Sequence, residues 1–244
     1  MKTIHAVWEK ENLGVNAYEI FLSDEDTPEA VAQEEKRLAA EGAEYIVLKT
    51  PVNCSHLLFG LPKLGYTYVE TVFKIEVRRS DYRSPDGIAR FDRGLTVKHR
   101  ADPAEWEPVF ERIHSGIFRS DRITLDPAFP PETGGNRYAN WLRNMLLKGA
   151  DLYEVYKGEK AIGFFVIQRK DEYTVDPVLM AMYDEQNDRG LGVLLHKKTL
   201  DTCFTYDCKR LTSTFVSNNS KVLRIYVSVG ATIADTLYTY VKHL

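Results

Sequence analysis

Two spacings of hydrophobic and polar residues alternate along the chain. Short apolar or strictly alternating runs, rich in β-branched and aromatic residues, predict strands at residues 16–22, 44–49, 66–78, 95–99, 151–156, 161–168, 174–183, 211–216 and 232–242. Stripes with a helical period lie between them and predict helices at residues 24–41, 53–63, 102–116, 138–148, 193–204 and 219–229. Because helices interrupt the strands throughout, the pattern predicts a mixed α/β fold.

The stretch from 173 to 204 combines a strand, a polar break, a glycine turn and a helix. Gly190 and Gly192 stand at the mouth of that helix, where several backbone N–H groups lack helical partners. Together with the positive end of the helix dipole, these donors form a seat for phosphate. A dinucleotide-binding motif would require a third glycine where Leu195 stands, and the sequence lacks the Gly-Lys-Ser/Thr of a P-loop. A plain loop with two turn glycines is the alternative interpretation.

Residues 79–94 are polar and rich in turn formers, which indicates a joint between domains. We therefore expect an N-terminal half-domain at 1–79, a linker at 80–94 and a second domain at 95–244. An internal repeat places Gly65 over Gly230 and, at the same offset, Leu61 over Tyr226. Either two helix–glycine–strand units look alike by chance, or the N-terminal region is a truncated copy of the last unit of the C-terminal domain, with the two sheets side by side.

The composition mainly excludes classes of partner and location for the protein. A net charge of −3 and 27% charged residues are ordinary for a soluble protein and argue against nucleic acid or an anionic membrane as partner. No apolar run approaches the roughly 18 residues of a spanning helix, and the N-terminus turns acidic before a signal-peptide core develops. Three cysteines without CxxC spacing, and scattered histidines, indicate a cytoplasmic protein with reduced thiols and no metal site.

A second constellation lies downstream of the glycine turn. Asn219 and Tyr226 fall on one face of the predicted helix two turns apart, and Gly230 follows. An Arg-Gly-x-Gly turn between a strand and a helix, then a strand and Asn-x6-Tyr-x3-Gly, resembles the GNAT acyl-CoA N-acetyltransferases, over about residues 95–244. Asn187 departs from this pattern, because the family usually has Gln or Arg there, and the polar break at 184–188 is longer than in the subgroup below.

Within that family the chain most resembles the dTDP-fucosamine acetyltransferases, which acetylate dTDP-4-amino-4,6-dideoxygalactose. The likeness rests on the N-terminal half-domain, the Tyr138-Ala-Asn-Trp141 helix and the Gly230-Ala231 pair. It implies a GNAT fold with a mixed, mostly antiparallel sheet flanked by helices and a truncated GNAT-like half-domain at the N-terminus. It also implies an enzyme, an N-acetyltransferase that uses acetyl-CoA and no metal.

The resemblance implies a cofactor site and a catalytic residue. Acetyl-CoA would lie between the strands at 173–183 and 211–216, its pantetheine bonded to the first strand and its pyrophosphate seated on the glycine turn. The expected cofactor-binding residues are Val178, Met180, Met182, Asp188, Arg189, Gly190, Leu191, Gly192, Val193, Leu194, Asn219 and Arg224. Tyr226 would protonate the leaving thiolate, since a tyrosine with a pKa of about 10 keeps its proton at neutral pH. The alternatives are a packing tyrosine and a solvated Arg224.

The acceptor is the other half of the reaction. A nucleotide-linked amino sugar would stack on Phe118, Tyr138 and Trp141, and its diphosphate would meet Arg119, Arg122 or Arg137. A core Trp141 and solvated arginines are the plainer alternative. Another amine, such as a small molecule or a protein N-terminus, and a catalytically silent acyl-CoA-binding module also stay open. The edge of the strand at 232–242 is expected to pair with a second copy in a homodimer.

Overall fold

The structure is a computed structural model that describes residues 1–84, 92, 94–184 and 190–244. The described strands are β1 (Lys2–His5), β2 (Ala17–Phe21), β3 (Tyr45–Pro51), β4 (Thr67–Arg78), β5 (Leu95–His99), β6 (Asp151–Lys157), β7 (Lys160–Arg169), β8 (Thr174–Met182), β9 (Arg210–Val216) and β10 (Thr232–His243). The helices are α1 (Val7–Leu13), α2 (Pro28–Ala40), α3 (Ser55–Gly60), η1 (Leu61–Leu64), η3 (Pro103–Glu105), α4 (Glu107–His114), α5 (Arg122–Leu125), α6 (Thr133–Leu147), α7 (Leu191–Cys203) and α8 (Ser220–Ser228). The predicted mixed α/β fold is confirmed.

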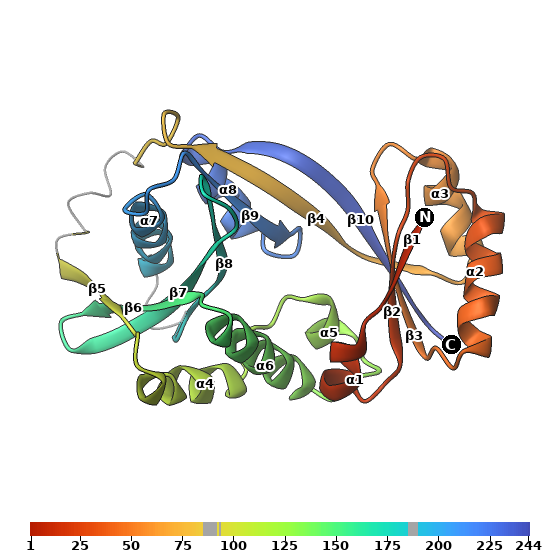
Figure 1. Cartoon of the computed structure of the whole chain (residues 1–244), viewed down its shortest axis with the longest axis horizontal. Helices are drawn as coiled ribbons and strands as arrows, with labels where there is room; N and C mark the ends of the chain where they lie inside the picture. Colours follow the sequence, from red (N-terminus) through yellow and green to blue (C-terminus); the bar gives the residue numbers. More distant parts are fainter. Residues whose placement is uncertain (85–91, 93, 185–189) are drawn as a thin grey trace.

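The described strands form one sheet in the order β1-β2-β3-β10-β4-β9-β8-β7-β6-β5. Most neighbours are antiparallel, and the parallel pairs are β2 with β3 and β8 with β9. β4 and β10 are long antiparallel strands at the centre that cross from one lobe of the molecule to the other (Figure 1). β10 is therefore paired on both sides, and the expected free edge for a homodimer is wrong: β1 and β5 are the edge strands.

The internal repeat corresponds to a real structural duplication. The offset that places Gly65 over Gly230 also places the first residue of β3 over that of β9, and the first residue of β4 over that of β10. The strand order is symmetric about the β4–β10 pair, so that β1, β2 and β3 correspond to β7, β8 and β9. The two copies do not form separate sheets side by side, because each copy contributes its last strand to the other lobe. Residues 1–79 and 95–244 thus share one sheet, and the expected linker lies largely outside the described residues.

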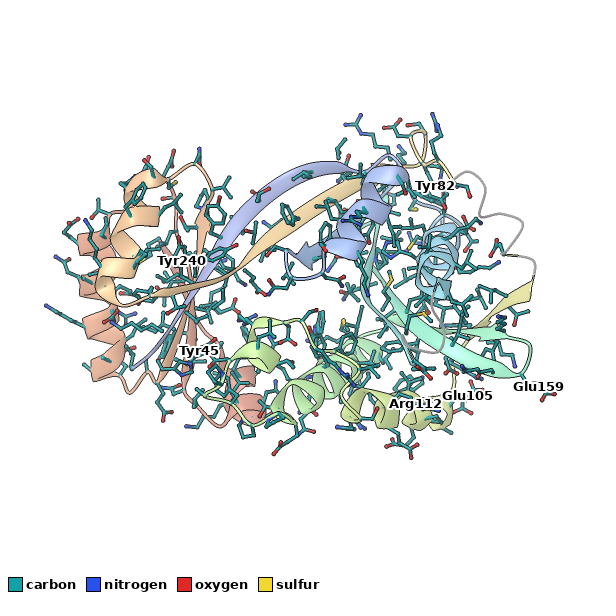
Figure 2. The ribbon with its side chains drawn as sticks, turned by 180° about the vertical axis from the view of Figure 1, so that it is seen from behind. Tyr45, Tyr82, Glu105, Arg112, Glu159 and Tyr240 are labelled. Carbon is teal, nitrogen blue, oxygen red and sulfur yellow. The ribbon has the colours of Figure 1, made fainter. Side chains whose placement is uncertain are left out.

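Helices cover both faces of the sheet in each lobe (Figure 1). In the C-terminal lobe, α7 and α8 pack on one face and α4 and α6 on the other. In the N-terminal lobe, α2 and α3 cover the face that carries Tyr240, while Tyr45 faces α1 and α5; both tyrosines are labelled in Figure 2. No described helix is long and apolar enough to cross a membrane.

Helix α6 begins at Thr133, earlier than the predicted start at 138. The sequence there contains Gly134 and Gly135, which favour a loop when judged locally. In the fold they allow close packing, because a Cβ on Gly134 would lie 2.2 Å from the Thr124 hydroxyl and one on Gly135 would lie 3.1 Å from the Ile113 carbonyl oxygen. Tertiary contacts therefore override the local preference.

Candidate active site

β8 and β9 are parallel neighbours that separate soon after they begin. They pair only at Thr174 with Arg210 and at Val175 with Leu211. Two residues beyond Val175 stands Pro177, whose carbonyl accepts a hydrogen bond from the Ser213 hydroxyl of β9 at 3.4 Å. The backbone nitrogen and carbonyl of one residue in a strand point toward the same neighbouring strand. Proline has no N–H group, so Pro177 cannot donate the hydrogen bond that would continue the pairing of β8 with β9. A V-shaped opening between the two strands results.

A β-bulge lies on β8 just beyond the proline. Val166 of β7 pairs with Leu179, and Ile167 pairs with Pro177, so Val178 is an extra residue. The matching strands of the N-terminal lobe differ, because β2 and β3 stay paired from Ala17–Tyr45 to Phe21–Lys49. Of the two copies of the repeat, the C-terminal one alone has the opening in the described residues.

A cavity of about 550 Å³ lies at the end of β8. Its wall comes from the segments 117–120, 180–184 and 218–221. Of the expected site residues, Met180, Met182 and Asn219 lie in this wall, together with Phe118 and Arg119 from the expected acceptor side. The fold thus brings the end of one separating strand, the start of α8 and the loop before α5 to one place.

The N-terminus of α7 lies next to this cavity. Gly190 precedes the helix with a φ of +85°, a left-handed conformation that suits glycine. The N–H groups at the start of the helix, residues 190–193, have no carbonyl partner within it. Among the residues that the structure describes, a Cβ on Gly192 would meet only the Met182 side chain, at 3.9 Å, so they leave the backbone there open to a ligand. Asp188 and Arg189, also expected at this site, lie outside the described residues.

Tyr226 lies in the core and not in the cavity wall. Its side chain is 1% exposed, stacked on Phe215 at 5.5 Å between ring centroids and edge-on to His196 at 4.7 Å. Burial raises the pKa of the Tyr226 phenol, and a hydrogen-bond interaction with Ser213 of β9 opposes that effect. The phenol is therefore protonated at neutral pH. Arg224, on the same helix, is exposed.

The expected acceptor residues divide into two groups. Phe118 stacks on Tyr138 with 4.0 Å between ring centroids, and Trp141 follows at 6.1 Å from Tyr138. The exposed fraction of Trp141 is 41%, so the alternative of a core tryptophan is wrong. Arg119 reaches the cavity, whereas Arg122 and Arg137 turn toward carboxylates of the N-terminal lobe.

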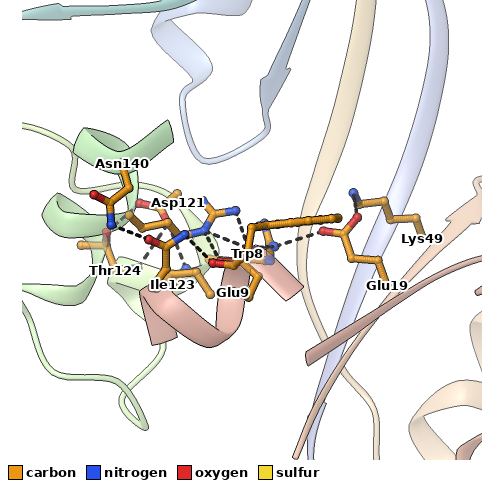
Figure 3. Close-up of polar contacts among 11 residues, drawn as sticks. Trp8, Glu9, Glu19, Lys49, Asp121, Ile123, Thr124 and Asn140 are labelled. Atoms are coloured by element: carbon orange, nitrogen blue, oxygen red, sulfur yellow. Dashed lines mark hydrogen bonds and ion pairs between the residues drawn. The ribbon is translucent and has the colours of Figure 1, made fainter. Parts of the chain in front are cut away.

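A buried polar network joins the lobes at this point (Figure 3). Arg137 donates to both carboxylate oxygens of Glu9, with nitrogen–oxygen distances of 2.8–3.0 Å, and Glu9 is only 2% exposed. Arg122 lies 3.6 Å from Glu19, which accepts from Lys49 at 2.9 Å. Arg122 and Arg137 are thus paired with carboxylates, so the alternative of solvated arginines is wrong for these two, whereas Arg119 is exposed as that alternative expects. No local pattern in the sequence pointed to this network, because its partners are contributed by distant parts of the chain.

A smaller cavity of about 320 Å³ adjoins the first and shares Tyr183 with it. The Tyr183 hydroxyl donates to the Glu154 carboxylate at 2.6 Å, and Glu154 forms an ion pair with Arg100 at 2.7 Å. Glu105 and Arg112, labelled in Figure 2, also line this cavity. No group of three or more potential metal ligands is assembled within the part of the chain that is described.

No family model matches the sequence, and no curated protein matches it. Solved structures do share the fold. A GCN5-related N-acetyltransferase from Kribbella flavida aligns with 93% of this chain and 80% of its own at 14% identity and a TM-score of 0.57. A tandem GNAT protein from the clavulanic acid biosynthesis pathway covers 88% of this chain and 69% of its own at 9% identity, with a TM-score of 0.54.

A third structure is the glucosamine N-acetyltransferase region of a fungal multi-domain β-N-acetylglucosaminidase. It aligns with 88% of this chain and 27% of its own at 13% identity and a TM-score of 0.61. At these identities the likeness establishes architecture alone. The chain has the GNAT fold, as predicted, including the GNAT-like N-terminal half-domain; its acceptor is a separate question.

Proposed function

We propose that the chain is an acetyl-CoA-dependent N-acetyltransferase that transfers the acetyl group directly to a primary amine. The observation that carries this proposal is the early separation of β8 and β9, next to the open N-terminus of α7 and the 550 Å³ cavity. An extended thioester chain fits beside a strand whose edge has lost its neighbour, and a pyrophosphate fits a helix start. The GNAT fold of the chain supports the same donor.

Coenzyme A would be held by backbone groups more than by side chains. The pantetheine amides add to the edge of β8 from Val178 to Met182, and the pyrophosphate accepts from N–H groups at the start of α7. Asn219 contacts the cofactor from the cavity wall, and Arg224 adds long-range attraction from the exposed face of α8. The N-terminal lobe offers no such site, since β2 and β3 remain paired and Thr27 caps the Ala30 N–H of α2.

The amine nitrogen attacks the thioester carbonyl, so that a C–N bond forms and the C–S bond breaks. A backbone N–H near Met182 stabilises the developing oxyanion. The departing thiolate takes its proton from Tyr226, and the proton of the amine leaves to water. Two observations support this assignment: the Tyr226 phenol keeps its proton, and it lies beside Ser213, where the two strands part.

For the acceptor we propose a nucleotide-linked amino sugar of the dTDP-4-amino-4,6-dideoxyhexose type. The stacked Phe118–Tyr138 pair next to the cavity supports a flat or ring-shaped acceptor. Of the three expected arginines, Arg119 lines the cavity, which supports a contact with a diphosphate. An acetyltransferase for a simpler amine would use the same acetyl-CoA site, and its acceptor would contact fewer of these aromatic and arginine side chains.

Thiol release from acetyl-CoA tests the proposal, with dTDP- and UDP-amino sugars compared against simple amines. We expect turnover with at least one amine, and failure on every sugar nucleotide would remove the specific acceptor while leaving the general activity. Binding of coenzyme A without turnover of any amine would identify a silent binding module.

Replacement of Tyr226 by phenylalanine tests the proton donor. General acid catalysis contributes about 10²–10⁴-fold, so we expect Tyr226→Phe to lower kcat by at least about 100-fold with unchanged affinity for coenzyme A. Tyr173→Phe, at a half-exposed tyrosine ahead of β8, is the matched control and should retain full activity. A Tyr226→Phe enzyme with the wild-type kcat would show that the residue only packs.

A further inference from the structure

Tyr183 connects the two cavities. It lies in the wall of the 550 Å³ cavity and in that of the smaller 320 Å³ cavity, and no other described residue lines both. It directly follows Met182 at the end of β8, where its N–H donates to the Ile162 carbonyl of β7 at 3.0 Å. The side chain is half-buried, and its ring stacks on that of Phe164 with 6.0 Å between centroids. These contacts fix the tyrosine at the boundary between the proposed acceptor site and the smaller cavity.

Tyr183 lies on the face of the sheet that carries the proposed acceptor wall. Tyr183, Phe118 and Tyr138 pack against the same core cluster, which α4 and α6 cover. The Phe164 ring contacts both Tyr183 and Phe118, the latter edge-on at 6.4 Å between centroids. Tyr226 belongs to the cluster on the opposite face, under α7 and α8. An amine bound along the aromatic wall therefore approaches the β8–β9 opening from the side of Tyr183, while the proposed acid lies on the other side.

The smaller cavity places a buried carboxylate behind Tyr183. Glu154 lines this cavity and is only 5% exposed. The Tyr183 hydroxyl donates to its Oε1 at 2.6 Å, and its Oε2 accepts from the Tyr156 hydroxyl at 2.9 Å and from the Arg100 Nε at 2.8 Å. Because the Tyr183 proton is directed at Glu154, the phenol oxygen keeps a lone pair for another donor. Tyr183 and Glu154 thus form a hydrogen-bonded path from one cavity to the other.

The charges around this path determine which group can keep a proton. Arg100 also pairs with the exposed Glu105 at 2.9 Å, and the exposed Arg112 of α4 lies over the Tyr183 ring, with its guanidinium carbon 5.6 Å from the centroid. Burial and the hydrogen bond to Glu154 raise the pKa of Tyr183 above its ordinary value of 10.0, and Arg112 opposes this in part. The phenol therefore holds its own proton at neutral pH, so it can accept a second proton only by passing the first to Glu154.

We propose that Tyr183 and Glu154 form a proton relay that removes the proton of the attacking amine. The proposal rests on the proposed acetyl transfer and names the groups through which that proton reaches water. As the C–N bond forms, the nitrogen becomes positively charged and its proton acidic. That proton moves to the Tyr183 oxygen while the Tyr183 proton moves to Oε1 of Glu154, and the N–H electron pair stays on nitrogen. Glu154 then releases its proton to solvent through the smaller cavity, which restores both residues.

Two conservative variants test the relay. Tyr183→Phe and Glu154→Gln should each lower kcat for acetyl transfer by at least about 100-fold, the lower end of the usual contribution of acid–base catalysis, with an unchanged KM for acetyl-CoA. Tyr153→Phe is the matched control, because Tyr153 precedes Glu154 on β6 but packs on the opposite face, with its hydroxyl bonded to Tyr206. It should keep the wild-type kcat. Wild-type kcat in both relay variants would overturn the proposal.

Chemical rescue separates a relay from a structural ion pair. In Glu154→Ala, a small carboxylate that enters the smaller cavity should restore kcat at least tenfold, and the restored rate should rise from chloroacetate to formate to acetate, in order of increasing pKa. A carboxylate that only pairs with Arg100 would give a rate that does not follow this order, and such a result overturns the relay. If circular dichroism shows that Glu154→Ala does not fold, the kcat of Tyr183→Phe decides.

Asp184 provides the competing assignment, because its carboxylate also lines the larger cavity. A large loss of kcat in Asp184→Asn, together with a wild-type kcat in Tyr183→Phe, would make Asp184 the base and overturn the relay. The failures of the two proposals are distinguishable. A wild-type protein that acetylates no amine overturns the transfer and the relay together, whereas an active enzyme whose kcat is indifferent to Tyr183→Phe and Glu154→Gln overturns the relay alone.

Discussion

Asp176 shows how one side chain marks the point where β8 and β9 separate. Its side chain is 14% exposed, its Oδ1 has no hydrogen-bond partner in the described part of the chain, and Lys170 lies 3.4 Å from the other oxygen. Burial raises the pKa of this carboxyl from 3.8 to about 6, and the lysine offsets only part of that effect. The folded protein therefore holds the proton more tightly than the unfolded chain does.

This proton makes stability depend on pH in a defined direction. The contribution is fully present below pH 3.8 and is lost as the pH rises through about 6. Between pH 4 and pH 7 we expect the free energy of unfolding of wild type to fall, relative to Asp176→Asn, by about 2 kcal/mol. Urea unfolding of both proteins at the two pH values measures this, with the exposed Asp207→Asn as control. A difference that does not change with pH would contradict the assignment.

At the scale of elements, the start of α7 is the feature on which the donor site depends. Gly190 takes a left-handed conformation, but Gly192 does not have a positive φ, and of the described residues only the Met182 side chain borders it. The backbone conformation at residue 192 does not require glycine. The absence of a side chain there therefore suggests that the position must leave space for a ligand. The open first turn of α7 provides that space for a pyrophosphate under the proposed function.

Gly192→Ala separates stability from cofactor affinity. The new Cβ meets no backbone, and alanine favours the helix by up to about 1 kcal/mol, so the stability should be unchanged or slightly higher. Because the methyl group occupies the approach to the N–H groups, KM for acetyl-CoA should rise about tenfold while KM for the amine stays the same. A wild-type KM for acetyl-CoA would place the pyrophosphate elsewhere.

The sequence predicted elements well where their pattern is local. The strand at 95–99 and the alignment of Gly65 with Gly230 in the repeat agree with the structure. β1 and α1 were not predicted, because a four-residue edge strand and a mostly exposed helix carry little periodic signal. The burial of Tyr226 and the Glu9–Arg137 ion pair depend on contacts between distant segments of the chain, so no short window of sequence contains them.

At the scale of the whole molecule, the exchange of β4 and β10 ties the two lobes into one folding unit. β10 pairs with β3 along the register from Leu237–Pro51 to His243–Tyr45, so the N-terminal core is incomplete without it. β4 in turn pairs with β9 in the C-terminal lobe. The Glu9–Arg137 ion pair adds a second connection on the covered face.

We therefore expect both lobes to unfold in a single transition. Trp8 reports on the N-terminal lobe, and Trp106 and Trp141 report on the C-terminal lobe. In urea, fluorescence of a variant that keeps only Trp8 and fluorescence of one that keeps only Trp106 should give the same midpoint as far-UV circular dichroism. Midpoints that differ between the two variants would show that the lobes unfold independently.

The strand exchange also affects how the protein is made. Thr67, at the start of β4, leaves the ribosome long before Thr232, at the start of β10. At a synthesis rate of about 5–20 residues per second, β3 and β4 wait about 10–30 s for the strand that belongs between them. During that interval two neighbouring backbone edges remain unpaired, and the nascent N-terminal lobe is open to pairing with strands of other chains. Slower synthesis lengthens that interval. We therefore expect the yield of folded protein to fall when translation after residue 79 is slowed.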